Sequence, residues 1–120
     1  MHELSIAQSI LDIVRQHVPE QDLTEVRTVR VLVGEGSGVV ADSLSFSFEA
    51  IVAHTPMAEA RMEIERIPFR LECDACHVVS SNDDGLRLCP ECGSASTKIL
   101  SGTELRVKEI ELSDHVGSGA

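Results

Sequence analysis

The four cysteines of the chain stand in two Cys-x-x-Cys pairs, a spacing that is typical of a metal site. Cys73 and Cys76 form the first pair and Cys89 and Cys92 the second, with twelve residues between the pairs. Each pair can place two sulfurs on one tight turn, and two facing turns complete a tetrahedral zinc site. Four protein ligands leave no open position on the metal. The sequence therefore predicts a structural zinc site and no catalysis at the metal.

Three other uses of these cysteines fit the sequence less well. Two disulfides would need an oxidising compartment, and the N-terminus lacks the basic start and apolar block of a signal peptide. A thioredoxin-type dithiol uses one Cys-x-x-Cys pair, not two matched pairs. Iron on four thiolates stays open, because ligand type alone does not separate it from zinc. His77 follows Cys76 and could replace a thiolate, although a supporting position beside the zinc shell is favoured.

A second group of potential ligands lies at the N-terminus. The imidazole of His2 is adjacent to the α-amine, to its own amide nitrogen and to that of Glu3. Together these nitrogens can form a compact chelate that suits nickel(II) or copper(II) in tetragonal geometry. Glu3 adds negative charge beside it. A histidine near a terminus is usually incidental, so the chelate is one of two readings that the residues alone leave open.

The charge of the chain excludes several classes of partner. Ten basic and twenty acidic residues give a formal charge of −10. Such a surface repels phosphate backbones and anionic lipids, so neither nucleic acid nor membrane is expected as a partner. No apolar run is long enough to span a bilayer. The N-terminus does not resemble a signal peptide, and cysteines bind a metal only when they are reduced. The expected location is therefore the cytoplasm.

The remaining sequence must supply the elements that position these groups. Apolar residues at spacings of three and four predict two helices, the second capped by Asp42 or Ser43, and alternating residues predict three strands. A Gly-x-Gly-x-Gly string from Gly34 to Gly38 lacks the lysine and the spacing of a phosphate-binding loop, which favours a structural turn. The predicted elements are a helix over Leu4–Val18, a strand over Val26–Val33, a helix over Leu44–Ala53 and strands over Ala60–Ile67 and Glu104–Leu112.

The predicted fold class is α+β: a small sheet of about three strands with two helices, carrying an inserted zinc-ribbon domain. The last strand is expected to return to the first sheet. The predicted domains are residues 1–68 with 101–115, the ribbon of residues 69–100, and a flexible tail of residues 116–120. The exposed edge of a small sheet could pair with another copy, so a homodimer is one expected state.

The order of these motifs resembles the HypA/HybF family of hydrogenase-maturation accessory proteins, the nickel metallochaperones. The N-terminal Met1-His2-Glu3 opens directly onto an amphipathic helix, as in that family, and the resemblance covers nearly the whole chain. One departure stands just before the second helix, where many relatives have an acidic residue and then proline but this chain has Val40 and Ala41. Asp42 is close by but is not assigned to nickel. The matching segments are residues 1–3, 33–39, 43–49, 73–76, 89–94, 102–105 and 110–112.

The resemblance implies a function and a ligand set. His2 corresponds to the family's nickel ligand with Glu3 beside it, and residues 1–68 with 101–115 become a nickel-binding domain. The four cysteines correspond to the zinc ligands. Nickel is then cargo, zinc is a structural cofactor, and the protein is not an enzyme. Such proteins pass nickel to the large subunit of [NiFe]-hydrogenase with a nickel-handling GTPase, and some also serve urease and its accessory proteins.

A zinc-ribbon adaptor in transcription or translation is the alternative function. Ribbons often bind nucleic acid, but this ribbon has only three basic residues, Arg70, Arg87 and Lys98, and five acidic ones. No aromatic platform for stacking on bases is present. The charge of the ribbon therefore argues against this alternative.

Overall fold

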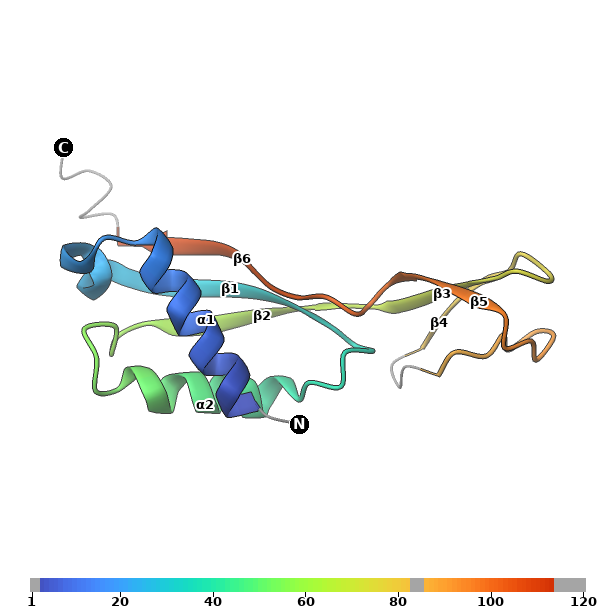
Figure 1. Ribbon diagram of the computed structural model, residues 1–120, viewed down its shortest axis with the longest axis horizontal. Coiled ribbons are helices and arrows are strands. Elements are labelled where there is room, and N and C mark those ends of the chain that lie inside the picture. Colours follow the sequence, from blue (N-terminus) through green and yellow to red (C-terminus); the bar gives the residue numbers. More distant parts are fainter. Residues whose placement is uncertain (1–2, 83–85, 114–120) are drawn as a thin grey trace. The chain divides into compact units, whose positions relative to one another are not determined.

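The computed structural model describes residues 3–82 and 86–113 of the chain. These residues form two sheets, one with the strand order β2-β1-β6 and one with the order β4-β3-β5 (Figure 1). The elements are α1 (Glu3–His17), a 3-10 helix η1 (Glu20–Glu25), β1 (Val26–Gly34), α2 (Ala41–Val52), β2 (Arg61–Ile67), β3 (Phe69–Cys73), β4 (Val79–Asn82), β5 (Thr97–Ser101) and β6 (Leu105–Leu112).

The chain divides into two compact units. The helical unit comprises Met1–Val31, Val40–Glu65 and Arg106–Ala120, and the ribbon unit comprises Leu32–Val39 and Arg66–Leu105. The predicted domain ranges stay predictions, and the predicted tail of residues 116–120 lies outside the described residues. The two units are described separately below.

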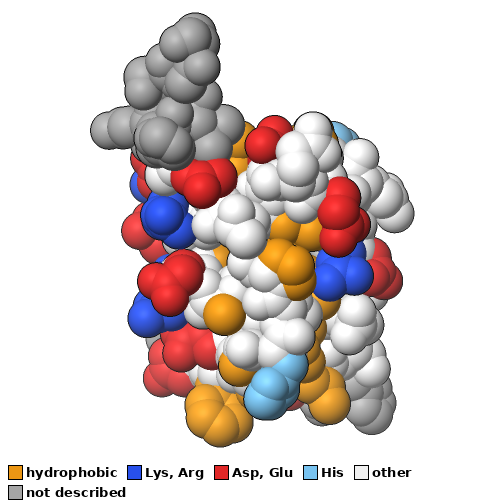
Figure 2. Space-filling view, turned by 90° about the vertical axis from the view of Figure 1, so that its left-hand side faces the viewer, with side chains coloured by type: hydrophobic (Ala, Val, Ile, Leu, Met, Phe, Trp, Pro, Cys, Tyr) orange, Lys and Arg blue, Asp and Glu red, His pale blue; other side chains and the backbone are white. Residues whose placement is uncertain are grey.

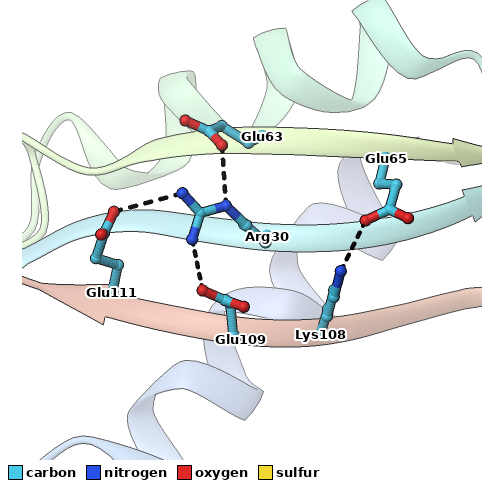
Figure 3. Close-up of polar contacts among 6 residues, drawn as sticks. All are labelled: Arg30, Glu63, Glu65, Lys108, Glu109 and Glu111. Carbon is cyan, nitrogen blue, oxygen red and sulfur yellow. Dashed lines mark hydrogen bonds and ion pairs between the residues drawn. The ribbon is translucent and has the colours of Figure 1, made fainter.

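The helical unit has the predicted α+β architecture. The two helices pack against each other and lie on one side of the sheet (Figures 1 and 3). The last strand, β6, returns to pair beside β1, as predicted. α1 ends at His17. Pro19 explains this end, because proline disfavours helix at the residue before it, Val18. The predicted helices and strands of this unit are all present, with ends that differ by a few residues.

The core of the helical unit consists mainly of aliphatic side chains. The inward positions of each helix recur every three or four residues, which is the spacing that predicted both helices. Phe48 is fully buried at its centre, whereas Phe46, two residues earlier on α2, is 75% exposed. The buried helical residues are Ala7, Ile10, Leu11 and Val14 of α1 and Leu44, Phe48 and Val52 of α2.

The predicted cap of the second helix is wrong. α2 begins at Ala41, its N-cap residue is Val40, and no side chain of its own caps it. Instead the Val40 N–H donates to a carboxylate oxygen of Glu3, 3.2 Å away. Glu3 begins α1, so a carboxylate from one helix satisfies the start of the other and faces the positive end of its dipole. Neither Asp42 nor Ser43 is needed for the cap.

The sheet face opposite the helices is charged. Arg30 of β1 donates to Glu63 of β2 at 3.0 Å and to Glu109 of β6 at 2.5 Å, and it lies 3.6 Å from Glu111 (Figure 3). Lys108 of β6 pairs with Glu65 of β2 at 2.9 Å. The hydrogen bond to Glu109 is the largest of the effects that raise the pKa of Arg30. One face is therefore dry and the other wet, as expected for an antiparallel sheet.

Charges of both signs intermingle on one face of the molecule. In Figure 2, acidic and basic side chains lie together along both margins, and hydrophobic side chains show between them. On this face, the described residues do not form the continuous basic tract that a phosphate backbone would attract. Among the described helices, none is both long and apolar enough to cross a membrane.

Candidate metal centre

The ribbon unit places the first cysteine pair at the end of a three-stranded sheet. β3 pairs antiparallel with β4 and β5, and Cys73, its last residue, lies opposite Thr97. Phe69, Leu71 and Cys73 alternate along β3 as buried residues, so their side chains share the inner face. The sheet therefore fixes the position of Cys73 before any metal is considered.

Each pair closes a tight turn of the same kind. The N–H of His77 donates to the Cys73 carbonyl at 2.9 Å, and the N–H of Gly93 donates to the Cys89 carbonyl at 2.8 Å. Both donors come four residues after the first cysteine and have positive φ, 63° for His77 and 73° for Gly93. Glycine adopts this conformation freely, but histidine does so at a cost. His77 thus occupies the position that glycine holds in the second turn.

The turns bring the four sulfurs together. All four Sγ atoms lie within 4.8 Å of one another. The Cys73 and Cys92 sulfurs are 3.6 Å apart, as are those of Cys76 and Cys89. A tetrahedron with zinc–sulfur bonds of about 2.3 Å has sulfurs about 3.8 Å apart, whereas a disulfide requires about 2.05 Å. The arrangement fits zinc on four thiolates, and the predicted grouping of the cysteines is confirmed.

The electrostatics of the cluster favour a dication. Backbone N–H groups of Cys76 and Ala75 donate to the Cys73 sulfur and lower the pKa of that thiol to about 6. At Cys76 a hydrogen bond from the Val78 N–H also lowers the pKa. Burial and the hydrogen bonds to the other thiols outweigh this effect and raise the pKa of Cys76 to about 12. The pKa of Cys92 is also raised. One thiolate therefore forms readily, and the others need a cation to compensate their charge.

A polar bridge connects the segment after the second cysteine pair to the first turn. The hydroxyl of Ser96 donates to the carboxylate of Asp74 at 3.0 Å, and the Asp74 N–H donates to the Ser96 carbonyl at 2.9 Å. Asp74 stands between Cys73 and Cys76, so these bonds hold the chain beyond the second pair beside the first pair. His77 does not join the group of potential ligands found among the described residues. Its contribution there is the left-handed turn.

The predicted nickel ligands are only partly within the described residues. His2 lies outside them, so its position is not available and the chelate stays a prediction. Glu3 is described, and its carboxylate accepts the Val40 N–H. This contact fixes the residue next to the chelate to the start of α2. Sequence reasoning missed it because the partners are 37 residues apart.

The Gly-x-Gly-x-Gly string is a structural turn, as predicted. The N–H groups of Gly34, Glu35 and Gly36 all donate to backbone carbonyls, of Glu104, Ile67 and Gly102. A Cβ on Gly36 would lie 2.3 Å from the ring of Phe69. The amides are therefore used within the ribbon unit and are not free to bind a phosphate.

Comparisons with known proteins agree with one another. Residues 1–112 match the family described as "Hydrogenase/urease nickel incorporation, metallochaperone, hypA". The chain is 37% identical over 115 residues to the hydrogenase maturation factor HypA of Roseiflexus sp. strain RS-1, covering 95% of this chain and 94% of that protein. It is 43% identical over 116 residues to the HypA of Streptomyces avermitilis, covering 95% of this chain and 88% of that protein.

Solved structures show the same fold. The solution structure of the Ni metallochaperone HypA from Helicobacter pylori matches with a TM-score of 0.63 and 24% identity, covering 94% of this chain and 98% of that one. At this identity the likeness concerns the fold alone. It covers nearly the full length of both chains.

Proposed function

Because the chain belongs to the HypA family of hydrogenase and urease nickel-incorporation metallochaperones, we propose that His2 is the nickel ligand from which it delivers the ion to [NiFe]-hydrogenase. The observation that carries the proposal is the extent of the family match, which begins at residue 1 and so covers His2 as well as all four cysteines. Nickel is the cargo of this protein, and zinc is its structural cofactor.

The N-terminus is suited to release as well as binding. In this proposal the α-amine, the His2 imidazole and the adjacent amide nitrogens bind the ion, and an acceptor replaces these ligands one at a time. Glu3 does not need to bind the metal in this scheme. Its carboxylate holds the start of α1 to Val40 at the start of α2, which gives the flanking chelate a fixed base.

The zinc site has a different role. Cys73, Cys76, Cys89 and Cys92 would hold the ion with all four positions filled, which leaves none for a substrate. The ion cross-links the two turns of the ribbon unit. The zinc has no open position for a substrate, and the nickel is bound and passed on unchanged. We therefore expect that the protein is not an enzyme.

The proposed partners are those that the family resemblance implies. The proposed acceptor is the hydrogenase large subunit, reached together with a nickel-handling GTPase, and urease accessory proteins are a further acceptor class. The proposed location is the cytoplasm, because the four cysteines are free thiols and a reducing compartment keeps them available to a metal.

A transfer assay tests this function. The chain with its native N-terminus is loaded with nickel and mixed with the nickel-free large subunit in the presence of a competing chelator. We expect nickel to reach the subunit from the wild type and not from His2→Ala. His54→Ala is the matched control and should deliver as the wild type does, because His54 is an exposed histidine beyond the end of α2. Equal delivery by His2→Ala would contradict the proposal.

A further inference from the structure

The ribbon sheet has apolar side chains on the β5 side of its inner face and polar ones on the β4 side. Leu71 of β3 lies opposite Ile99 of β5 and opposite Ser80 of β4. Residues that lie opposite each other in neighbouring strands share one face of the sheet, so Ser80 occupies the inner face where β5 supplies an isoleucine. Asn82 takes the same face, opposite Phe69. The core of the ribbon is therefore incomplete beside β4.

A groove of about 340 Å³ lies at this incomplete side of the core. It is lined by Ser80 and Asn82 of β4 and by Leu86, Leu88 and Cys89 of the segment that leads into the second cysteine turn. Leu86 is 54% exposed and Leu88 is 42% exposed. The side-chain amide of Asn82 donates to the Leu86 carbonyl at 2.9 Å, which holds the leucine segment to the end of β4. The groove is thus already formed in the free chain, and its two leucines gain from being covered.

The outer edge of β4 lies beside the groove. In the order β4-β3-β5, β4 is the last strand on its side, and none of the other described strands pairs with its outer edge. Such an edge can pair with an extended segment of another protein. The side chains of that segment alternate between the two faces of the sheet, so every second one points to the inner face, where Ser80 and Asn82 line the groove. One extended segment therefore pairs with the edge and fills the groove together.

The charge of the ribbon determines which residues suit the ends of this segment. Residues 69–100 include three basic and five acidic residues, and zinc on four thiolates is itself a dianion. Glu91 is exposed and follows Pro90, which lines the groove. Complementary charges speed the encounter of two surfaces, and like charges exclude wrong partners. Lysine or arginine at the ends of the segment is therefore complementary to the ribbon, and acidic residues there are not.

We propose that the groove beside β4 binds an extended segment of a partner protein, in which a leucine-sized apolar side chain is flanked by lysine or arginine. The segment pairs with the outer edge of β4, and its apolar side chain packs against Leu86 and Leu88. It thereby completes the β4 side of the ribbon core. This inference concerns the ribbon unit alone and does not rest on the proposed nickel ligand.

Short synthetic peptides test the proposal on the zinc-loaded full chain. The probe is the acetylated and amidated peptide KTLTLTK, whose leucines share one face of an extended chain. KTSTSTK lacks the apolar side chains, and ETLTLTE reverses the flanking charges. Because β4 has only 4 residues, the probe should bind weakly, with a dissociation constant of about 0.1–1 mM. We expect ETLTLTE to bind about tenfold more weakly at low salt and KTSTSTK to show no binding.

Amide chemical shifts locate the site, and groove variants test it. The probe should shift the amides of β4, Cys89 and Gly93 and leave those of α1 and α2 unchanged. Ser80→Leu fills the groove from within the chain and should weaken probe binding about tenfold or more, with zinc content unchanged. Leu88→Ser removes one apolar wall and should weaken binding by a similar factor. Leu100→Ser is the matched control, because Leu100 of β5 is 47% exposed and does not line the groove; it should bind as the wild type does.

Four results would overturn the proposal. KTLTLTK might as well be absent if it shifts no amide of β4, and equal binding of all three peptides would remove the argument from the anchor and from charge. Normal binding by Ser80→Leu would place the peptide elsewhere, as would equal weakening by Leu88→Ser and Leu100→Ser. If the same amides shift with protein concentration alone, the occupant of the groove is a second copy of this chain and the proposal is wrong.

Discussion

Removal of zinc should unfold the ribbon unit and leave the helical unit folded. In the segment from Phe69 to Ser101, the buried residues among those described are Phe69, Leu71 and two of the cysteines. Full burial of an apolar side chain contributes about 1.5–3 kcal/mol. A structural zinc contributes about 10–16 kcal/mol in small zinc-binding peptides. Within this segment, the metal therefore outweighs the apolar contacts.

The helical unit has a core of its own. Its buried side chains come from α1 and the residue after it, η1, β1, α2, β2 and the loop between α2 and β2, and none of them is a cysteine. These contacts do not involve the metal. The structure thus predicts two levels of stability within one chain, and only the lower one depends on zinc.

Amide hydrogen exchange with and without a chelator distinguishes the two levels. In the zinc-free chain, the N–H groups of Cys73, Cys89 and Gly93, which donate to carbonyls in the ribbon, should exchange at the rates of an unfolded peptide. Amides in the buried turns of α1 and α2 should keep their protection. Protected ribbon amides without zinc would refute the reasoning. Loss of protection in both units together would refute it equally.

Three further outcomes follow from particular contacts. Glu3→Ala removes the acceptor of the Val40 N–H and should lower the free energy of unfolding by about 1 kcal/mol, whereas Glu3→Gln retains an acceptor and should recover most of it in thermal melts. Phe48→Ala should cost about 3–5 kcal/mol in denaturant unfolding because the ring is fully buried, while Phe46→Ala, at a ring 75% exposed, should change stability by about 0.5 kcal/mol or less. Zinc must displace protons from the thiols with raised pKa values, so zinc affinity should fall as pH falls. Below pH of about 6, Cys73 also becomes protonated, and the plot of log affinity against pH should steepen there; titrations that show no change of slope would contradict this.

The helical unit was predictable because its signals are local. The spacing of Ala7, Ile10, Leu11 and Val14 defines one face of α1 without knowledge of its neighbours. The cap of α2 was not predictable in the same way. Its acceptor is Glu3, 37 residues away, and only the packing of the two helices brings the carboxylate to Val40. A local search found Asp42 and Ser43 instead, because it could consider only nearby side chains.

The zinc ligands were predictable from spacing, but the ribbon around them was not. β3 carries only three buried residues, Phe69, Leu71 and Cys73, and β4 has just 4 residues. Such short strands have too few alternating positions to stand out in a sequence. The left-handed turn at His77 was also missed, since histidine, unlike glycine at position 93, gives no sign of a positive φ.

The central claim is that nickel and zinc occupy separate sites, at His2 and at the four cysteines. Metal analysis of the chain with its native N-terminus, dialysed against nickel, tests it directly when the wild type is compared with His2→Ala. The account predicts that the wild type keeps zinc and gains nickel, and that His2→Ala keeps the same zinc but loses the nickel. Equal nickel in both proteins, or nickel gained only at the expense of zinc, would contradict it.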